Sequence, residues 1–313
     1  MPDGSLLIVE NGGHRIRKLS GGTTSTFMGN GANSSTGDGG TPAAATIGGP
    51  RDVVLAPGAT ATDYTLYVSS YNQHNVRKIA VVGGVGTVST IAGTGVTGFS
   101  GDGGAANAAQ LANPTGLSVD QVTGDLYIAD TTNNRIRKIT ATAGVITGAS
   151  TITTVLGDGT ASSTGDGGLA TAATVNGPQA VFATAVAGDA TTTGTFVVAD
   201  TAGHRIRRVD ASGTITTIIG TGTACSASSV ICGDFGPATS AQIKTPHAII
   251  SDGAGGYYFA DNGDYRVRRV TAAGTITTVF GNGTACSPTT DRCGDGGPAE
   301  AANLNTVYDL VLL

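Results

Sequence analysis

The chain has 313 residues, of which 39% are apolar and only 12% charged, and its formal net charge is −5. This length suits one large domain or two ordinary ones. The charges form no acidic or basic block, so the long-range field gives no support to a nucleic-acid partner. No apolar stretch approaches the roughly 20 residues that a membrane-spanning helix needs, and the first ten residues do not resemble a signal peptide.

One phrase recurs five times along the chain and defines a repeat. It reads LIVENGGHRIRKL, YVSSYNQHNVRKI, YIADTTNNRIRKI, VVADTAGHRIRRV and YFADNGDYRVRRV. A period of this size indicates a propeller, a solenoid or another array. The apolar residue at the centre of each Arg motif fixes the spacings at 60, 60, 70 and 61 residues, counted between Ile16, Val76, Ile136, Ile206 and Val267.

The third copy shows the content of one unit. Its β-rich runs cover 113–120, 126–130, 135–140 and 150–157, each bounded by Gly, Asn, Asp or Pro. Four antiparallel strands per unit are typical of a propeller blade, and no window holds the 3.6-residue period of a helical repeat. We therefore predict an all-β propeller of five four-stranded antiparallel blades, with residues 1–313 as a single domain.

The two ends of the chain predict how the ring closes. Residues 1–10 begin inside the first turn of a unit, whereas VYDLVLL (307–313) matches the opening strand PRDVVLA (50–56). We expect the C-terminal strand to pair with 6–9 and complete the N-terminal blade. That pairing would remove two exposed sheet edges.

The repeated phrase resembles the NHL repeat, which is named after an Asn-His-Leu signature in this turn. Fragments of the signature survive as Asn133-Asn134 and as His14, His74 and His204. The connector GTGVTGFSGDGGAANAAQLANPTGLSVD is similar to the Gly-Asp-Gly-Gly connectors of secreted and cell-surface NHL proteins. NHL propellers commonly have six blades, so a sixth blade outside this chain is the alternative to five. The resemblance implies architecture alone, because the family includes RNA binders, protein-interaction modules and a peptide-amidating lyase.

An acidic residue ends the strand that precedes most of the Arg motifs. We predict a repeated clasp between this carboxylate and an Arg of the motif, which leaves little net positive surface for an RNA-reading face. The residues at this position are Glu10, Ser70, Asp130, Asp200 and Asp261.

Each connector carries a Gly-Asp-Gly or similar turn before an Ala-rich run. We expect its Asp to cap a short helical turn, with calcium coordination as the alternative. The spaced carboxylates of an autonomous calcium loop are missing, so no cofactor is the main expectation. The aspartates are Asp38, Asp102, Asp166, Asp234 and Asp295.

All four cysteines lie in the last two connectors. Each pair has six intervening residues, which predicts the disulfides Cys225–Cys232 and Cys286–Cys293 and an oxidising compartment. A zinc site is disfavoured, because no spare His accompanies either pair. The sequons that begin at Asn33 and Asn282 are candidate glycosylation sites in a eukaryotic secretory host.

The residue that follows the Pro or Val at the start of each innermost strand differs from blade to blade. In propellers this position usually opens onto one mouth of the central channel, so we predict a ligand-binding site there, against the simpler reading of unconstrained surface positions. The residues are Arg51, Thr115, Gln179, His247 and Tyr308.

These observations favour an extracellular or cell-surface propeller that acts as a binding or assembly module. We expect a protein or glycan partner, or another copy of the chain, and no nucleic acid. The alternative is a channel-mouth, metal-dependent lyase or hydrolase. Only His247 is available as a histidine ligand there, no Gly-x-Ser-x-Gly elbow is present, and the chain contains only Glu10 and Glu300 as glutamates.

Overall fold

The structure is a computed structural model that describes residues 1–184, 194–226, 232–287 and 293–311. The chain divides into two compact units, Met1–Val155 and Leu156–Thr184 with Thr195 onward. Each unit is built from consecutive antiparallel sheets, the blades of a β-propeller. Five blades lie in the described part of the chain, as the repeat predicted, and no helix there is long and apolar enough to cross a bilayer.

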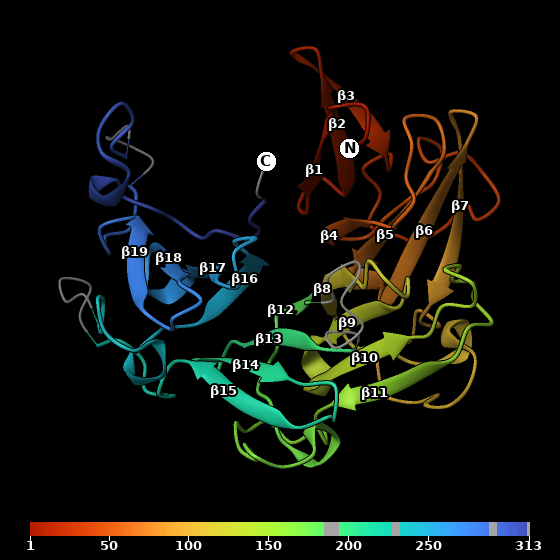
Figure 1. The fold of residues 1–313 in the computed structure, drawn as a ribbon. Coiled ribbons are helices and arrows are strands. Elements are labelled where there is room, and N and C mark those ends of the chain that lie inside the picture. The colour runs from red at the N-terminus through yellow and green to blue at the C-terminus, as the bar shows by residue number, and fades with distance from the viewer. Residues whose placement is uncertain (185–193, 227–231, 288–292, 312–313) are drawn as a thin grey trace. The chain divides into compact units, whose positions relative to one another are not determined.

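The first unit contains three blades (Figure 1). Its strands run β1 (Leu6–Glu10), β2 (Arg15–Ser20) and β3 (Thr23–Met28); β4 (Pro50–Leu55), β5 (Tyr64–Ser70), β6 (Asn75–Val82) and β7 (Val85–Ala92); and β8 (Pro114–Val119), β9 (Leu126–Asp130), β10 (Arg135–Ile139) and β11 (Ile152–Leu156). The third blade confirms the four runs predicted from its sequence, to within two residues at each end.

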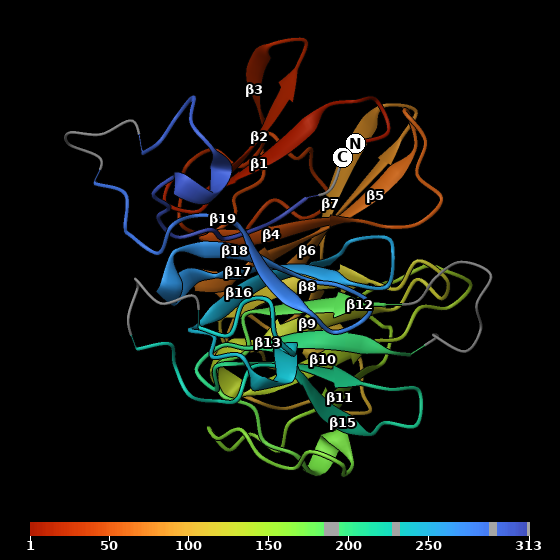
Figure 2. The ribbon, with the colours of Figure 1, turned by 60° about the vertical axis from the view of Figure 1, so that its left-hand side comes forward.

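The second unit contains the fourth and fifth blades, whose sheets can be followed in Figure 2. Its strands are β12 (Ala180–Ala183), β13 (Phe196–Asp200), β14 (Arg205–Val209) and β15 (Ile215–Ile219), then β16 (Pro246–Ser251), β17 (Tyr257–Asp261), β18 (Arg266–Val270) and β19 (Ile276–Phe280). In every four-stranded blade the strands are neighbours in chain order.

Burial falls from the middle of a blade toward its outer edge. All five residues of β9 and of β13 are buried, because both faces of these strands pack inside the protein. Such strands read as continuous apolar runs rather than as an alternation. At the outer edge of the first blade, β3 is mostly exposed and carries Thr and Ser instead.

The connectors also form backbone hydrogen bonds with the outer strands of the blades. Gly103 donates its N–H to the carbonyl of Ile152 at 2.8 Å, and Ile152 donates back to Gly104 at 3.0 Å. The turn before the third blade thus covers the edge of β11, which would otherwise be open to pairing. Gly101 makes this turn with φ +85°, and a Cβ there would lie 2.6 Å from Ala109. Other connectors bond in the same way, at Gly39–Val88, Gly167–Ile215 and Phe235–Ile276.

Among the described residues, the first blade has three strands and residues 305–311 carry no strand. The predicted closing strand, 307–313, extends beyond the described residues, and its pairing with 6–9 stays a prediction. Local side chains accept two backbone N–H groups in this segment: Asn305 Oδ1 accepts from Thr306 at 3.1 Å, and Asp309 Oδ1 accepts from Leu310 at 2.7 Å. Such local bonds compete with strand pairing.

Candidate functional site

A buried arginine forms the polar centre of each of the second to fifth blades. Its guanidinium meets a connector aspartate that precedes the same blade in the chain. A charge inside a protein is costly unless it is paired, and the four arginine side chains are 0–1% exposed. The pairs are Arg77–Asp38 at 2.5 Å, Arg137–Asp102 at 2.8 Å, Arg207–Asp166 at 2.7 Å and Arg268–Asp234 at 2.5 Å.

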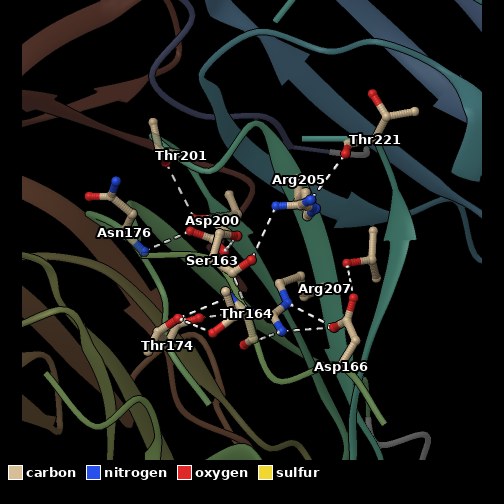
Figure 3. A network of polar contacts seen from close by, with 12 residues as sticks. Ser163, Thr164, Asp166, Thr174, Asn176, Asp200, Thr201, Arg205, Arg207 and Thr221 are labelled. Atoms are coloured by element: carbon tan, nitrogen blue, oxygen red, sulfur yellow. Dashed lines mark hydrogen bonds and ion pairs between the residues drawn. The ribbon is translucent and has the colours of Figure 1, made fainter. Parts of the chain in front are cut away.

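Figure 3 shows the polar contacts around Arg207. Besides Asp166, its guanidinium donates to the carbonyls of Thr174 at 2.7 Å and Thr164 at 2.9 Å. The other oxygen of Asp166 accepts from the Thr217 hydroxyl at 2.6 Å. Burial works to raise the pKa of Asp166, but the bonds from Thr217 and Arg207 outweigh it and lower that pKa.

The predicted clasp at the end of the preceding strand is present for the three aspartates of the third to fifth blades. Asp130, Asp200 and Asp261 lie 3.4, 3.6 and 3.4 Å from the same arginines. Burial raises the pKa of Asp130 to about 6 and that of Asp261 to about 7, even though an arginine stands beside each. Each of these three carboxylates also accepts a backbone N–H from a residue before the blade's first strand, such as Asn176 to Asp200 at 2.8 Å.

The capping role predicted for the connector aspartates is wrong. Short 3₁₀ turns do follow, at η2 (Ala106–Ala108), η4 (Ala170–Ala172), η6 (Ala238–Ser240) and η8 (Ala299–Ala301), but none has a side-chain cap. Four of the five carboxylates are instead bound to arginine. Among the described residues, no three His, Cys, Asp or Glu side chains are grouped to hold a metal ion.

The five predicted ring residues are divided between the two units. In the first unit, the Arg51 guanidinium stacks over the Tyr71 ring at 4.6 Å, and the Thr115 hydroxyl lies 2.6 Å from that of Thr131. In the second unit, Gln179 donates its backbone N–H to Ala199 at 3.3 Å. The structure brings together two of the five: the rings of His247 and Tyr308 meet edge to face, with centroids 5.7 Å apart.

A cavity of about 360 Å³ lies beside this pair, within the second unit. Hydroxyl, amide, imidazole and phenol groups line it, with no Asp, Glu, Lys or Arg among them. The lining residues are Thr201, Thr245, His247, Asn262, Gly263, Tyr265, Asn305 and Thr306.

Hydrogen bonds connect consecutive blades at the regular junctions. At three of them, a histidine in the left-handed conformation accepts a backbone N–H of the following blade through Nδ1. A second bond runs from the residue that follows the strand-ending acid: Asn11 Nδ2 donates to the Pro50 carbonyl at 3.1 Å, and Thr201 Oγ1 donates to that of Pro246 at 2.7 Å. The histidine bonds are Gly49 to His14 at 3.0 Å, Asn113 to His74 at 3.1 Å and Thr245 to His204 at 3.1 Å.

The junction after the fifth blade departs from this pattern at two positions. Tyr265 takes the place of the histidine, and Val307 takes the place of the proline. Unlike proline, Val307 has an N–H, which it donates to Asn262 Oδ1 at 2.9 Å. This turns the amide, so that Asn262 Nδ2 is buried without a hydrogen-bond partner in the structure, in a residue only 8% exposed.

Sequence reasoning identified His247 and Tyr308 but missed Asn262, Tyr265 and Val307. The repeat alignment contained the signal. Tyr265 is the one tyrosine at a position that the other copies fill with His or Asn, and Val307 is the one residue other than proline that precedes a ring residue.

Both predicted disulfides are confirmed. They join Cys225 to Cys232 and Cys286 to Cys293, with Cα atoms 5.9 and 5.4 Å apart. Both separations fit the usual range for a disulfide.

The two sequons lie on exposed connectors. Asn33 accepts a hydrogen bond from Asn72 at 3.1 Å. Asn282 Nδ2 donates to Asn303 at 2.7 Å and to Ala301 at 3.1 Å, so attachment of a glycan to that nitrogen would remove one of these bonds. Glycosylation stays a prediction at both positions.

The repeated sheets, Gly-Asp-Gly connectors and signature histidines define an NHL-type β-propeller domain. The family model for the teneurin NHL domain matches residues 23–231, and the chain belongs to this family. The resemblance drawn from the sequence is thereby confirmed. No curated protein matches the sequence significantly.

Solved structures share the fold at low sequence identity. An auxiliary nutrient binding protein from Bacteroides ovatus has a TM-score of 0.60 at 14% identity, over 99% of this chain and 61% of that one. Its counterpart from Bacteroides thetaiotaomicron has a TM-score of 0.59 at 14% identity, over 97% and 60%. A nidogen/laminin complex gives 0.52 at 14%, over 88% and 78%. This chain spans about 60% of the length of the two nutrient binding proteins.

Proposed function

We propose that this propeller is an extracellular or cell-surface binding module that holds its ligand at the fifth-blade cavity beside His247 and Tyr308. The observation that carries the proposal is the cavity itself, which is lined by uncharged polar and aromatic side chains and lies at the junction where Tyr265 and Val307 depart from the repeat. The regular contacts recur along the chain, whereas this arrangement is set apart by Tyr265 and Val307.

The two disulfides support the location, because such bonds persist in oxidising compartments. The names of solved structures with this fold support a binding role. Among structures of this fold are proteins named for nutrient binding and one partner of a nidogen/laminin complex. By analogy we assign to this chain the binding of a glycan or protein rather than catalysis, with self-assembly as a further form of protein binding.

Saturation-transfer NMR with three classes of small probe tests the proposal. The probes are neutral sugars, sugar acids, and amino acids blocked as N-acetyl amides. We expect at least one class to bind, and Tyr308→Ala to weaken that binding by about 1–3 kcal/mol. Tyr71→Ala is the matched control, since Tyr71 packs against Arg51 in the first unit, whereas the Tyr308 ring contacts His247 of the cavity lining.

Two results would overturn this assignment. One is the absence of binding by every probe class. The other is binding that survives both Tyr308→Ala and His247→Ala, which would place the ligand elsewhere on the protein. Conversion of a bound probe into product would favour the lyase or hydrolase alternative.

A further inference from the structure

The arginine at the centre of the first blade lacks the aspartate that its counterparts bind. Arg17 lies in β2 and is partly buried, with its Nε shielded from solvent. Among the described residues, its side chain forms no ion pair and no hydrogen bond. A cation that is partly withdrawn from water without an anion is costly. The equivalent arginines, each paired with a connector aspartate, are Arg77, Arg137, Arg207 and Arg268.

The last connector carries an aspartate that lacks an arginine. We call residues 293–304 the fifth connector. A Cβ on its Gly294 would lie 2.7 Å from Ala302, the same close approach that Gly101 makes in the connector of the third blade. Asp295 is exposed, and within the described chain its side chain has no ion pair or hydrogen bond. In each earlier connector the equivalent aspartate binds the arginine of the blade that follows it.

The outer strand of the first blade also lacks the connector bonds that the other blades have. Thr24 and Thr26 lie on β3, and both are exposed. At the equivalent positions of the second blade, Val88 exchanges backbone bonds with its connector at 2.8 and 3.0 Å, and Thr90 donates its N–H to Asp38 at 2.9 Å. None of the described connectors bonds to Thr24 or Thr26 in this way. The fifth connector has the same Gly-Asp-Gly-Gly turn and forms these bonds with no described strand.

The fifth connector also carries the carbonyl groups that a clasp arginine needs. In the fourth blade, Arg207 donates to the carbonyls of Thr164 and Thr174 (Figure 3). Thr174 donates its own N–H to Thr164 at 3.2 Å, and this bond holds the two carbonyls in place. At the equivalent positions of the fifth connector, Asn303 donates to Cys293 at 2.9 Å. The set of acceptors for an arginine is therefore already formed there.

The edge of β1 adds an apolar surface to the first blade. Among the described residues β1 pairs only with β2, and its Leu6 and Ile8 are 44% and 38% exposed. Residues 307–311 follow the fifth connector and resemble 50–54, the strand that borders β5 in the second blade. Val311 in this segment is 67% exposed. Burial of these apolar side chains against one another would favour association.

We propose that the fifth connector of one copy docks on the first blade of a second copy, where Asp295 pairs with Arg17 and 307–311 lies along β1. Charge complementarity selects this partner, because the anion that Arg17 lacks is exposed on every other copy. The two surfaces lie in different compact units, and each copy carries one of each, so the contact is head to tail and can repeat. Neither surface contains a residue of the cavity lining, so this inference goes beyond ligand binding there and gives self-assembly a defined site.

Sedimentation velocity on the full chain, over a range of concentrations, tests the proposal. We expect dimers and larger oligomers to form as the concentration rises. Arg17→Gln and Asp295→Asn each remove one half of the pair, and each should raise the Kd of association by roughly 30-fold or more. Arg208→Gln and Asp210→Asn, on and after β14, are the matched controls and should leave that Kd unchanged. Circular dichroism checks that all four variants fold.

Mixing the two variants separates contact between copies from closure within one copy. The Arg17→Gln variant still has Asp295, and the Asp295→Asn variant still has Arg17, so one intact contact can form between them. The two remaining ends are both altered. We expect a one-to-one mixture to form dimers and nothing larger, at concentrations where each variant alone is monomeric.

Each outcome supports or overturns the inference. Dimers in the mixture support it, and a mixture that stays monomeric overturns the contact between copies. A wild-type chain that is monomeric at every concentration also overturns it. If Arg17→Gln and Asp295→Asn then lower the melting temperature without adding in the double variant, the pair closes the ring within one copy. Association that neither variant weakens overturns the assigned surfaces. Ligand binding at the cavity is measured separately with the small probes, so the two proposals fail independently.

Discussion

Equivalent positions of the repeat form different hydrogen bonds at the regular junctions between blades and at the junction after the fifth blade. At the regular junctions His14, His74 and His204 accept backbone N–H groups, and the proline carbonyls at 50 and 246 are satisfied. At the last junction, Tyr265 and Val307 replace that chemistry and Asn262 Nδ2 is left over. In a repeat, shared residues therefore hold the blades together, and the departures mark where something else can bind.

The two regions should also differ in what a mutation costs. The arginine clasps are buried and have several partners each, so their loss should reduce stability. The fifth-blade junction already leaves the buried Asn262 Nδ2 without a partner, so changes there should affect binding more than stability. The following predictions probe this contrast, beginning with the largest effect.

Arg207→Leu should lower the free energy of unfolding by about 3–5 kcal/mol, because it leaves the buried Asp200 and the partly buried Asp166 without their cation. Urea unfolding followed by circular dichroism measures the change. Arg208→Leu, at the exposed next position, is the control and should stay within about 0.5 kcal/mol. A loss below about 1 kcal/mol for Arg207→Leu would show that the clasps do not hold the blades.

Cys286→Ser combined with Cys293→Ser should lower the free energy of unfolding by about 2–3 kcal/mol, since a closed loop restricts the unfolded chain. The same unfolding assay, with and without reductant, measures the effect. Mass spectrometry of unreduced peptides from the native source should show both predicted linkages. Free thiols there would contradict the oxidising compartment on which the proposed location rests.

The pH dependence of stability should report the buried aspartates. Burial raises the pKa of Asp261 to about 7 from its ordinary 3.8. The folded state therefore binds this proton more tightly than the unfolded chain, and its contribution to stability is present at low pH and lost as the pH rises through 7.

We expect the free energy of unfolding to be about 2 kcal/mol higher at pH 5 than at pH 7.5. Asp130 adds to the same trend, since its pKa is raised to about 6. Below about pH 4, carboxyls with a lowered pKa, such as Asp166, should reverse it. Asp261→Asn should flatten the profile between pH 5 and 7.5, whereas Asp210→Asn, with a lowered pKa, should not. Stability that rises with pH across this window would contradict the assignment.

Tyr265→His should raise the free energy of unfolding by about 1 kcal/mol, the smallest effect of the four. It restores the imidazole that accepts a backbone N–H at the other junctions, and here the imidazole would replace the local acceptor Asn305 Oδ1 for the Thr306 N–H. Thermal unfolding measures the gain, and binding of any cavity ligand should weaken at the same time. His204→Tyr makes the reverse change at a regular junction, and we expect a loss of similar size. If the two changes do not have opposite signs, the contrast between the junctions is wrong.

The sequence predicted what repeats and missed what depends on a single copy. Strand positions in the third unit, the disulfides and the strand-end clasp all follow from local patterns. The partner of Asp166 could not be predicted from the local sequence. The carboxylate pairs with an arginine 41 positions later in the chain, beyond the rest of the connector and two strands. The closing strand, expected from the similarity of 307–313 to 50–56, stays a prediction, and Asn305 and Asp309 supply local acceptors that this similarity does not take into account.

The connector clasps also define the natural module for duplication or for the design of longer arrays. A segment covering 93–156 carries Asp102 and Arg137 together and brings its own ion pair to a new position. A segment of similar length covering 114–177 carries Arg137 and Asp166, which belong to different pairs. Recombination at the start of a connector should therefore yield self-sufficient copies, whereas recombination at the start of a blade leaves each copy dependent on its neighbours.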